Sequence, residues 1–317
     1  MKDCSALAVA SRILGSIAVR DAPLGALTTY KVGGRAALLV KPATVADLVL
    51  VAEAREASGL PVLVVGRGSN MLVADDGFAG IAVWVPSLAG DLEVADPEAA
   101  DVRVRAGGGM ALPVVSRRLA ALGLRGFEWA VGVPGSIGGA VRMNAGGHGS
   151  DIAACLVEAE IFNLGAATVS TRPVDSLGLR FRASDLTDDD IVVTATIRVT
   201  PGDREAAEAE LAGIVRWRRE NQPGGQNAGS VFVNPVPGEV SAGSLIDRLG
   251  LRGFSIGTAG VSEKHANFIQ GSDGGSARDV RAVIDYVRER VADETGFRLR
   301  SEVRLIGFAD ADGPGAE

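Results

Sequence analysis

A glycine-rich turn lies between two apolar segments near the N-terminus, and the segment that follows it decides between fold families. Residues 61–65, Pro-Val-Leu-Val-Val, predict a buried strand, and Gly66-Arg67-Gly68-Ser69-Asn70 follow at once. In a Rossmann fold a helix opens directly after such a turn. Here residues 71–85, MLVADDGFAGIAVWV, predict strand, turn and strand instead. The Rossmann interpretation is therefore rejected, and the backbone N–H groups of the turn are expected to form an anion-binding nest.

Other glycines are clustered rather than spread along the chain. Of the 42 glycines, the densest groups lie in residues 107–109, 132–139 and 146–149. Single glycines are explained by turns, because glycine adopts conformations that are closed to other residues. Two separate Gly/Ser clusters are better explained by backbone that comes close to a bulky phosphorylated ligand.

The first half of the chain alternates strand and helix signals. Residues 36–40 predict a strand, a capping box of Thr44 and Asp47 begins a helix, and Gly59 ends it. Further strands are expected at residues 102–104, 157–162 and 191–199, with a helix from Leu112 to Gly123.

Helical signals return in the second half. Asp203 is expected to cap one helix, and Ser276 and Asp279 to form a capping box for another that Gly296 ends. The apolar faces are expected to be Leu211, Ile214, Val215 and Trp217 in the first helix and Val280, Val283, Ile284, Val287 and Val291 in the second. A final strand is predicted from alternation, with Phe297, Leu299, Val303 and Leu305 on one face and Arg298, Arg300, Glu302 and Arg304 on the other.

Composition argues against several classes of protein. The net charge is −7 over 317 residues, whereas a general binder of nucleic acid or anionic membranes needs a basic face. The only cysteines, Cys4 and Cys155, form no disulfide framework, and with only two histidines, His148 and His265, no zinc site is expected. No apolar run approaches the roughly 20 residues of a membrane helix, and the N-terminus lacks the pattern of a secretory signal. These features predict a cytoplasmic protein.

Eight motifs follow one another between about Thr28 and Gly307: TTYKVGG, VVGRGSNMLV, GVPGSIGGAVRMNAGGHG, RFRAS, AGSVFVNP, AGSLID, GVSEKHANFI and SEVRLIG. Together and in this order they resemble the UDP-N-acetylenolpyruvoylglucosamine reductase family of bacterial peptidoglycan precursor synthesis. The continuous stretch from Ser230 to His265 is similar to the shorter family type, which has no substrate-capping insertion.

This resemblance implies an α+β fold: a split, two-part FAD-binding unit of the vanillyl-alcohol-oxidase-like type and a C-terminal α+β substrate domain. The expected boundaries are residues 1–85 and 86–202 for the two FAD-binding subdomains, 203–307 for the reductase domain and 308–317 for a disordered tail. The implied activity is the NADPH-dependent, FAD-mediated reduction of UDP-N-acetylglucosamine enolpyruvate to UDP-N-acetylmuramate.

Three catalytic side chains are implied by the resemblance. Ser230 is the implied proton donor, and Arg182 the guanidinium that pairs with the substrate carboxylate as charge develops. Glu302 would hydrogen-bond or orient that carboxylate. From local pattern alone, Ser230 would be a turn residue and Glu302 a solvated salt-bridging residue. Arg180, predicted to share a strand face with Arg182, stays open as the alternative arginine.

The resemblance also implies backbone-rich contacts to non-covalent FAD. The residues expected at the pyrophosphate are Gly66, Gly68, Ser69, Asn70, Gly135, Ser136, Gly138 and Gly139, and those expected near the flavin ring are Asn144, Ala145 and Gly146. Asn234, Lys264 and His265 are expected to contact the UDP-sugar. His148 stands where the family commonly has an aromatic residue, and this position does not match the motif of histidine-linked flavin.

Two positions depart from the family pattern. Phe181 replaces a tyrosine, and Val233 replaces a lysine, so Lys264 and Arg218 become candidates for the missing cation. Two other functions stay open on sequence grounds. An FAD-dependent oxidase or dehydrogenase acting on alcohols or lactones is disfavoured by AGSVFVNP, and a non-catalytic protein with a degenerate FAD fold is disfavoured by the retention of all three catalytic residues.

Overall fold

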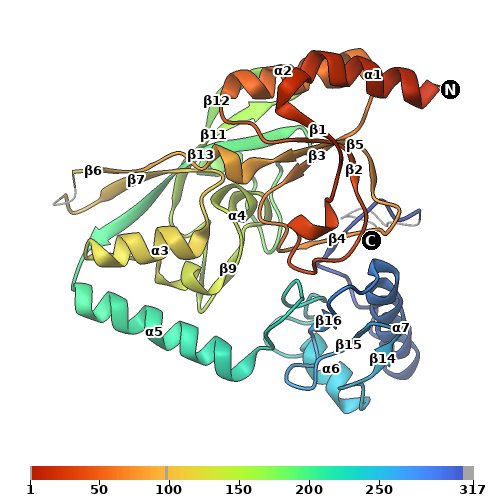
Figure 1. The fold of residues 1–317 in the computed structure, drawn as a ribbon. Helices are drawn as coiled ribbons and strands as arrows, with labels where there is room; N and C mark the ends of the chain where they lie inside the picture. The colour runs from red at the N-terminus through yellow and green to blue at the C-terminus, as the bar shows by residue number, and fades with distance from the viewer. Residues whose placement is uncertain (1, 97–98, 310–317) are drawn as a thin grey trace. The chain divides into compact units, whose positions relative to one another are not determined.

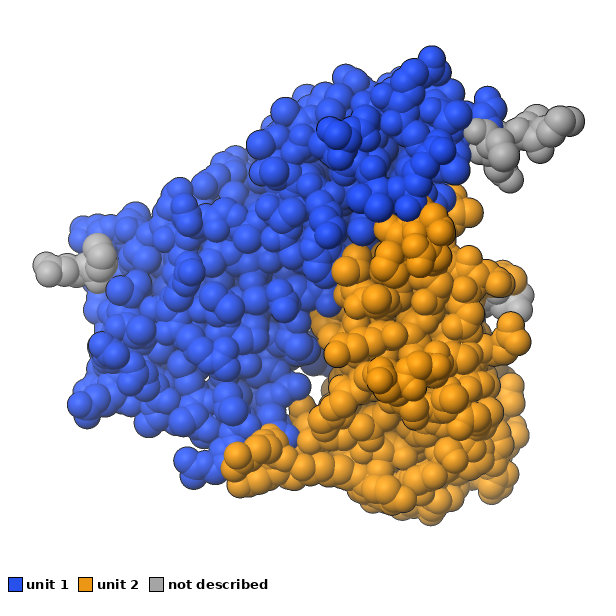
Figure 2. All heavy atoms as spheres, in the orientation of Figure 1, with its two compact units in different colours: residues 1–20, 37–67, 80–218 blue, residues 21–36, 68–79, 219–317 orange. Residues whose placement is uncertain are grey.

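The computed structural model describes residues 2–96 and 99–309, which fold into two compact units (Figure 1). One unit contains residues 1–20, 37–67 and 80–218, and the other contains residues 21–36, 68–79 and 219–317 (Figure 2). Each unit is thus assembled from segments that are far apart in the sequence. The boundaries expected from the sequence divide the chain into continuous stretches and stay predictions. Most of the expected tail, residues 310–317, lies outside the described residues.

A four-stranded sheet with the order β1-β2-β5-β3 forms the first layer of the first unit. Its strands are β1 (Ala18–Ala22), β2 (Ala36–Val40), β5 (Phe78–Trp84) and β3 (Val62–Val65), of which β3 and β5 run parallel. Helices α1 (Lys2–Leu14) and α2 (Val45–Ser58) pack against each other beside it (Figure 1). Buried side chains from both helices and the strands share one core.

Helix α2 begins and ends where the sequence predicts. The Thr44 hydroxyl accepts a hydrogen bond from the Asp47 N–H at 3.3 Å, and the Asp47 carboxylate accepts one from the Thr44 N–H at 3.0 Å. Gly59 ends the helix with φ +69°, a left-handed conformation that favours glycine. The strand–helix–strand prediction for this segment is confirmed.

The second layer of this unit is an antiparallel sheet with the order β12-β11-β13-β7-β6, to which β8 adds at β13. The strands are β6 (Leu92–Ala95), β7 (Val102–Gly107), β8 (Leu124–Arg125), β11 (Leu156–Asn163), β12 (Thr168–Pro173) and β13 (Asp190–Pro201). Helices α3 (Leu112–Ala121) and α4 (Ile137–Met143) bury their apolar side chains in the core of this sheet. The strands and the helix expected here are confirmed.

Helix α5 (Arg204–Asn221) is capped by Asp203, whose carboxylate accepts a hydrogen bond from the Ala206 N–H at 2.8 Å. Leu211 and Ile214 are buried as predicted. Val215 and Trp217 are 44% and 48% exposed, so their assignment to the buried face was wrong. The buried residues of the helix are spaced four and three positions apart and form one narrow face. Val215 and Trp217 lie next to that face.

The second unit contains a small antiparallel sheet, β14-β15-β16, and a parallel pair of β4 with β17. The strands are β14 (Ser255–Ile256), β15 (Ala259–Val261), β16 (Ile269–Gly271), β4 (Met71–Val73) and β17 (Arg304–Ile306). Helices α6 (Ala242–Arg248) and α7 (Ala277–Thr295) pack together, and the predicted apolar stripe of α7 is fully buried. Among the described residues no helix is both long and apolar enough to cross a membrane.

The final strand is shorter than the alternation predicts. Leu299 and Val303 are buried as expected, at 3% and 4% exposure. Regular pairing, however, covers only residues 304–306, and residues 297–300 belong to no strand. The reason is that only the last three residues find a continuous partner, in β4.

The first turn of α7 has only half of the predicted capping box. The Ser276 hydroxyl accepts hydrogen bonds from the N–H groups of Arg278 and Asp279, at 3.0 and 3.3 Å. The Asp279 carboxylate does not accept the hydrogen bond from the Ser276 N–H that a capping box requires. It accepts from the N–H and hydroxyl of Thr258 at 2.8 and 2.7 Å, so that half of the prediction was wrong.

Asp75, from the segment after β4, provides the rest of the cap. Its carboxylate accepts hydrogen bonds from the Ser276 hydroxyl at 2.9 Å, the Ala277 N–H at 2.9 Å and the Arg278 N–H at 3.0 Å. A negative charge at this end of a helix is also favourable to the helix dipole. Asp75 therefore ties residues 68–79 to the C-terminal part of the unit.

We expect Asp75→Ala to lower the free energy of unfolding by about 1–2 kcal/mol, the usual cost of losing a helix cap. Urea denaturation followed by circular dichroism would measure the loss. The neighbouring Asp76→Ala is the matched control, because Asp76 makes no hydrogen bond or ion pair with the described residues. Equal effects of the two changes would show that Asp75 is not a cap.

Candidate active site

The glycine turn after β3 presents several unused backbone donors. Gly68 has φ +61°, and a Cβ there would lie 2.5 Å from the Leu27 carbonyl oxygen, so only glycine fits. Within residues 2–96 and 99–309, the N–H groups of residues 66–70 donate to no other protein group. Successive unused N–H groups in a left-handed turn form a concave anion site. The turn therefore fits a pyrophosphate, as the sequence predicts for Gly66, Gly68, Ser69 and Asn70.

Ser136, in the second glycine cluster, lies directly beside Gly66. A Cβ on Gly66 would come within 2.7 Å of the Ser136 hydroxyl oxygen, so this close approach requires glycine. Ser136 is 2% exposed and caps helix α4, accepting a hydrogen bond from the Gly139 N–H at 3.3 Å. Gly66 of the first cluster is thus adjacent to Ser136 of the second within the first unit.

Three N–H groups of the second cluster, those of Ile137, Gly138 and Gly139, donate to acceptors inside the unit. Those of Ile137 and Gly138 donate to the carbonyls of Met110 and Gly108, at 2.9 and 2.8 Å. The Gly135 carbonyl accepts a hydrogen bond at 3.1 Å from the N–H of the first residue of α3. Gly138 and Gly139 therefore differ from the first turn, because their N–H groups already have acceptors within the unit.

Asn144 ends helix α4 with φ +38° and is 4% exposed. Its amide nitrogen donates to the Asp151 carboxylate and the Arg180 carbonyl, both at 3.2 Å, and its oxygen accepts from the Ala153 N–H at 3.0 Å. Ala145 donates its N–H to the Ala140 carbonyl at 2.9 Å. The side chain of Asn144 therefore has a structural task, holding together segments that surround the predicted flavin contacts.

A two-residue hairpin follows, formed by β9 (Gly146–Gly147) and β10 (Ser150–Asp151). His148 and Gly149 at its tip have φ +52° and +84°, as a type I′ turn requires. The His148 ring packs edge-on against Trp217, with centroids 5.1 Å apart. Burial and the nearby charge of Arg218 lower the pKa of His148, so the imidazole is neutral near pH 7.

Arg182 lies in a tight turn and not in a strand. Arg180 and Ala183 exchange two backbone hydrogen bonds, both 3.0 Å, around Phe181 and Arg182. Arg182 has φ +55°, an uncommon conformation for a residue with a side chain. The prediction that Arg180 and Arg182 share a strand face is therefore wrong, because the chain reverses between them.

The two arginines have different partners. The Arg180 guanidinium donates to the Asp185 carboxylate at 2.6 Å and the Gly178 carbonyl at 2.9 Å. The Arg182 Nη1 donates to the Gly146 carbonyl at 3.2 Å, and its Cζ lies 5.3 Å from the Phe181 ring centroid. Arg182 thus contacts the hairpin of the predicted flavin contacts, whereas Arg180 contacts Asp185 and Gly178.

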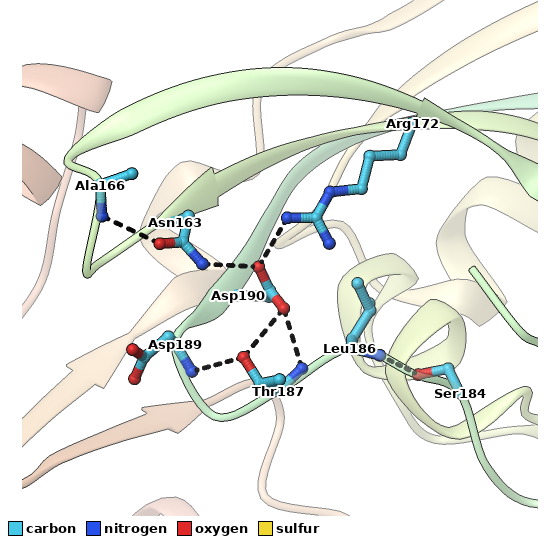
Figure 3. Close-up of polar contacts among 8 residues, drawn as sticks. All are labelled: Asn163, Ala166, Arg172, Ser184, Leu186, Thr187, Asp189 and Asp190. Atoms are coloured by element: carbon cyan, nitrogen blue, oxygen red, sulfur yellow. Dashed lines mark hydrogen bonds and ion pairs between the residues drawn. The ribbon is translucent and has the colours of Figure 1, made fainter. Parts of the chain in front are cut away.

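A buried carboxylate anchors the segment that follows Arg182 (Figure 3). Asp190 accepts hydrogen bonds from the Thr187 N–H and hydroxyl, both at 2.9 Å, and from Asn163 and Arg172, both at 3.0 Å. Its side chain is 3% exposed. Burial raises the pKa of Asp190, but these hydrogen bonds and the Arg172 charge outweigh it, so the pKa is lowered overall. The sequence gave no signal for this residue, because its partners come from three separate segments.

In the second unit, three predicted motifs meet through backbone contacts. The Glu302 N–H donates to the Val231 carbonyl at 2.7 Å, directly after Ser230. The Asn70 side-chain nitrogen donates to the Glu302 carbonyl at 2.9 Å, and the Arg304 N–H returns to the Asn70 carbonyl at 3.0 Å. The unit therefore holds Asn70, Ser230 and Glu302 together although they are far apart in the sequence.

The Ser230 hydroxyl makes no hydrogen bond within the part of the chain that the structure describes, and the residue is partly exposed. A serine that only capped a turn would use its hydroxyl on a nearby backbone group. The turn at Gly229 is closed by Asn227 instead, which accepts the Gly229 N–H at 3.0 Å. The local alternative for Ser230 is therefore not supported.

Each predicted substrate contact also has a structural partner. Asn234 accepts a hydrogen bond from the Ala242 N–H at 3.1 Å, and the Lys264 ammonium donates to the Arg219 carbonyl. The His265 Nδ1 accepts from the Asn267 N–H at 3.2 Å, and burial, followed by the charge of Arg252, lowers the pKa of His265. The roles of these three residues in substrate binding stay predictions.

Arg218, the other candidate cation, pairs with no carboxylate among the described residues, and burial lowers its pKa. No group of three or more His, Cys, Asp or Glu side chains in residues 2–96 and 99–309 is arranged to hold a metal ion.

Known proteins match both parts of the chain. A family described as UDP-N-acetylenolpyruvoylglucosamine reductase, C-terminal domain, matches residues 221–306, and one described as FAD binding domain matches residues 36–171. A UDP-N-acetylenolpyruvoylglucosamine reductase of Heliobacterium modesticaldum is 41% identical over 304 residues, covering 94% of each chain. That of Gloeobacter violaceus is 41% identical over 291 residues, covering 90% of this chain and 94% of the relative. A crystal structure of the Thermus caldophilus enzyme aligns with a TM-score of 0.75 at 30% identity, covering 91% of this chain and 98% of that one.

We expect Asp190→Asn to destabilise the protein by about 1–3 kcal/mol at neutral pH, the range for losing hydrogen bonds to a charged group. Because the folded pKa of Asp190 is depressed, its stabilisation is complete above the unfolded carboxyl pKa of about 3.9 and disappears as pH falls through the folded pKa. Denaturation of both proteins at several pH values should show the gap closing only in acid. Asp188→Asn, at a 65% exposed side chain, is the control; a gap independent of pH would contradict the assignment.

Proposed function

The chain belongs to the UDP-N-acetylenolpyruvoylglucosamine reductase family, and we propose that Ser230, Arg182 and Glu302 carry out its reaction. The reaction is the NADPH-dependent, FAD-mediated reduction of UDP-N-acetylglucosamine enolpyruvate to UDP-N-acetylmuramate, a step of peptidoglycan precursor synthesis. The protein is therefore an FAD-dependent oxidoreductase. FAD, when bound, supplies the hydride that the double bond receives.

The substrate determines what the protein itself must supply. Its double bond is conjugated to a carboxylate, so hydride addition at the terminal carbon leaves an enolate-like charge. A proton must then reach the carbon beside the carboxylate. The chain has to stabilise the developing charge and to deliver that proton.

Ser230 is assigned as the proton donor, and its uncommitted hydroxyl is the observation that carries this assignment. The backbone around it is fixed. Ser230 forms an isolated antiparallel β-bridge with Phe268, and the Val231 carbonyl accepts a hydrogen bond from the Glu302 N–H. The hydroxyl thus has a defined position and no structural task among the described residues. Serine is a weak acid, but a carbanion beside a carboxylate is a strong enough base to take its proton.

Arg182 is assigned to the substrate carboxylate. Its planar guanidinium can donate two parallel hydrogen bonds as negative charge grows there. The Phe181 ring beneath its Cζ offers a cation–π contact, which orients the guanidinium although the family's tyrosine hydroxyl is absent. The left-handed backbone at Arg182 supports a functional placement, since such conformations are maintained where the surrounding structure requires them.

Glu302 is assigned to orient the same carboxylate. Its backbone is held on both sides, by Val231 and by Asn70. A carboxyl group at this place can hydrogen-bond the substrate carboxylate or help to orient it.

For FAD, the unused N–H groups of residues 66–70 support non-covalent binding of the pyrophosphate. The close approach of Gly66 to Ser136 supports a role for the second glycine cluster in shaping that site. Asn144, Ala145 and Gly146 are proposed to lie near the flavin ring.

On the substrate side we assign Asn234, Lys264 and His265 to the UDP-sugar. Arg218, which pairs with no carboxylate among the described residues, is the better candidate for the cation lost at Val233, because the Lys264 ammonium already donates to a carbonyl. We also propose a cytoplasmic location, in keeping with a chain that has two cysteines and no disulfide framework.

We expect Arg182→Lys to lower kcat by about 10²-fold or more with a smaller change in KM, because the charge stays but the two-pronged donor is lost. Steady-state oxidation of NADPH with the enolpyruvyl substrate would measure both constants. Arg180→Lys is the matched control, since that guanidinium pairs with Asp185. Wild-type turnover of Arg182→Lys together with a slow Arg180→Lys would move the role to Arg180.

Ser230→Ala should separate the two half-reactions. Bleaching of the flavin by NADPH needs no proton at the substrate carbon and should stay near the wild-type rate. Recovery of flavin absorbance on adding substrate should slow by about 10²–10⁴-fold, the usual contribution of a general acid. Stopped-flow absorbance follows each step, with Ser244→Ala, on α6, as the control. Equal slowing of both steps, or of neither, would refute Ser230 as the acid.

A further inference from the structure

Asn267 makes a two-point contact with the backbone next to Ser230. Its side-chain nitrogen donates to the Phe232 carbonyl at 2.8 Å, and its side-chain oxygen accepts from the Phe232 N–H at 2.9 Å. Its own carbonyl accepts from the Val231 N–H at 2.9 Å. Asn267 is 5% exposed, so all three hydrogen bonds are shielded from water. Asn267 belongs to the sequence motif KHANFI, which also contains Lys264 and His265.

The segment from Ser230 to Val233 is held from two sides. On one side lie Asn267 and Phe268, and on the other the Glu302 N–H donates to the Val231 carbonyl at 2.7 Å. The Val233 N–H donates to the Arg300 carbonyl at 3.0 Å. The segment therefore resembles the central strand of a sheet, except that at Phe232 a side-chain amide takes the place of a neighbouring peptide group.

Only an amide fits this place without loss. A carboxamide carries one acceptor and a donor on the same planar group, as a peptide does, so it satisfies both backbone groups of Phe232. A carboxylate can accept from the N–H but turns a second acceptor towards the carbonyl. A shorter or apolar side chain leaves both buried groups without a partner.

Asn267 is itself held firmly. Its N–H donates to the His265 Nδ1 at 3.2 Å, and the Phe268 N–H donates to the His265 carbonyl at 3.0 Å. The lowered pKa of His265 agrees with a neutral ring whose Nδ1 is an acceptor. Ala266 and Phe268 on either side are 3% and 2% exposed. The turn of residues 265–268 is thus a fixed support.

We infer that Asn267 is a positioning residue for proton delivery: its amide holds Phe232, and through Val231 it sets the place of the Ser230 hydroxyl relative to the Glu302 backbone. The inference rests on the proposed role of Ser230 as the acid. The inference gives Asn267 no direct part in the reaction, since both polar atoms of its buried amide are bonded to the Phe232 backbone.

The test is Asn267→Asp, which keeps the size of the side chain and the acceptor and removes the donor. Bleaching of the flavin by NADPH should be unchanged. Recovery of flavin absorbance with substrate should slow by about 10- to 100-fold, the scale of a misplaced catalytic group. Lower pH should rescue this step, because a protonated carboxyl again has a donor and an acceptor, and burial raises the pKa of the introduced group. Asn267→Ser, which retains one hydroxyl, is the second variant if the first does not retain FAD.

Ser276→Ala is the control for stability alone. It removes a cap of α7 in the same unit without touching residues 230–233, so it should lower the melting temperature and leave both half-reactions unchanged. Parallel slowing of both steps in Asn267→Asp, in proportion to lost FAD, would reduce Asn267 to a structural residue and overturn the inference.

A double-mutant cycle with Ser230→Ala separates this inference from the proposed function. If Asn267 acts through Ser230, Asn267→Asp should add almost nothing to the slow substrate step of Ser230→Ala. Fully additive effects would overturn the positioning role while the acid assignment stands. A normal substrate step in Ser230→Ala alone would instead remove the acid assignment on which the inference rests.

Discussion

The parallel pairing of β4 with β17 is the constraint on which the second unit depends. Met71 follows the glycine turn directly, and Arg304 comes two residues after Glu302, so their pairing places Asn70 beside Glu302. Parallel strands need a long connection, and here most of the chain lies between the two. Such a long closure costs entropy, which the buried core around α7 has to offset. The position of the turn with unused N–H groups is therefore coupled to that of Glu302, the glutamate proposed to be catalytic.

What the sequence predicted well is local. The capping box of α2, its glycine end and the apolar stripe of α7 each depend on residues within a few positions of one another, and all are confirmed. The errors arise where a distant partner competes. Asp279 bonds to Thr258 rather than to Ser276, and the last strand is only as long as β4 allows. Val215 and Trp217 follow the same rule, because helix packing, and not apolar character, decides which side of α5 is buried.

For the candidate site, too, the sequence predicts local features but not the contacts between distant segments. The order of the motifs indicates the family, and the similar composition of the two glycine clusters predicts the same role for both, contact with the pyrophosphate. Their hydrogen bonds separate them: the N–H of Gly138 is used by Gly108, while residues 66–70 keep theirs. No local pattern reveals this, since Gly108 lies in another glycine group. Arg180 and Arg182 could not be told apart for a related reason. The turn that separates them depends on backbone bonds, and the charge of Arg180 is balanced by Asp185.

This pairing of charges explains how an acidic chain can serve an anionic substrate. With a net charge of −7, the average field repels a diphosphate and a carboxylate. Local charge is set instead by which cations a carboxylate neutralises. Arg105, Arg125 and Arg172 each pair with a carboxylate and contribute little positive potential. Arg218, in contrast, pairs with no carboxylate among the described residues. Positive charge can thus persist locally at a cation such as Arg218 although the chain as a whole is acidic, which composition alone cannot indicate.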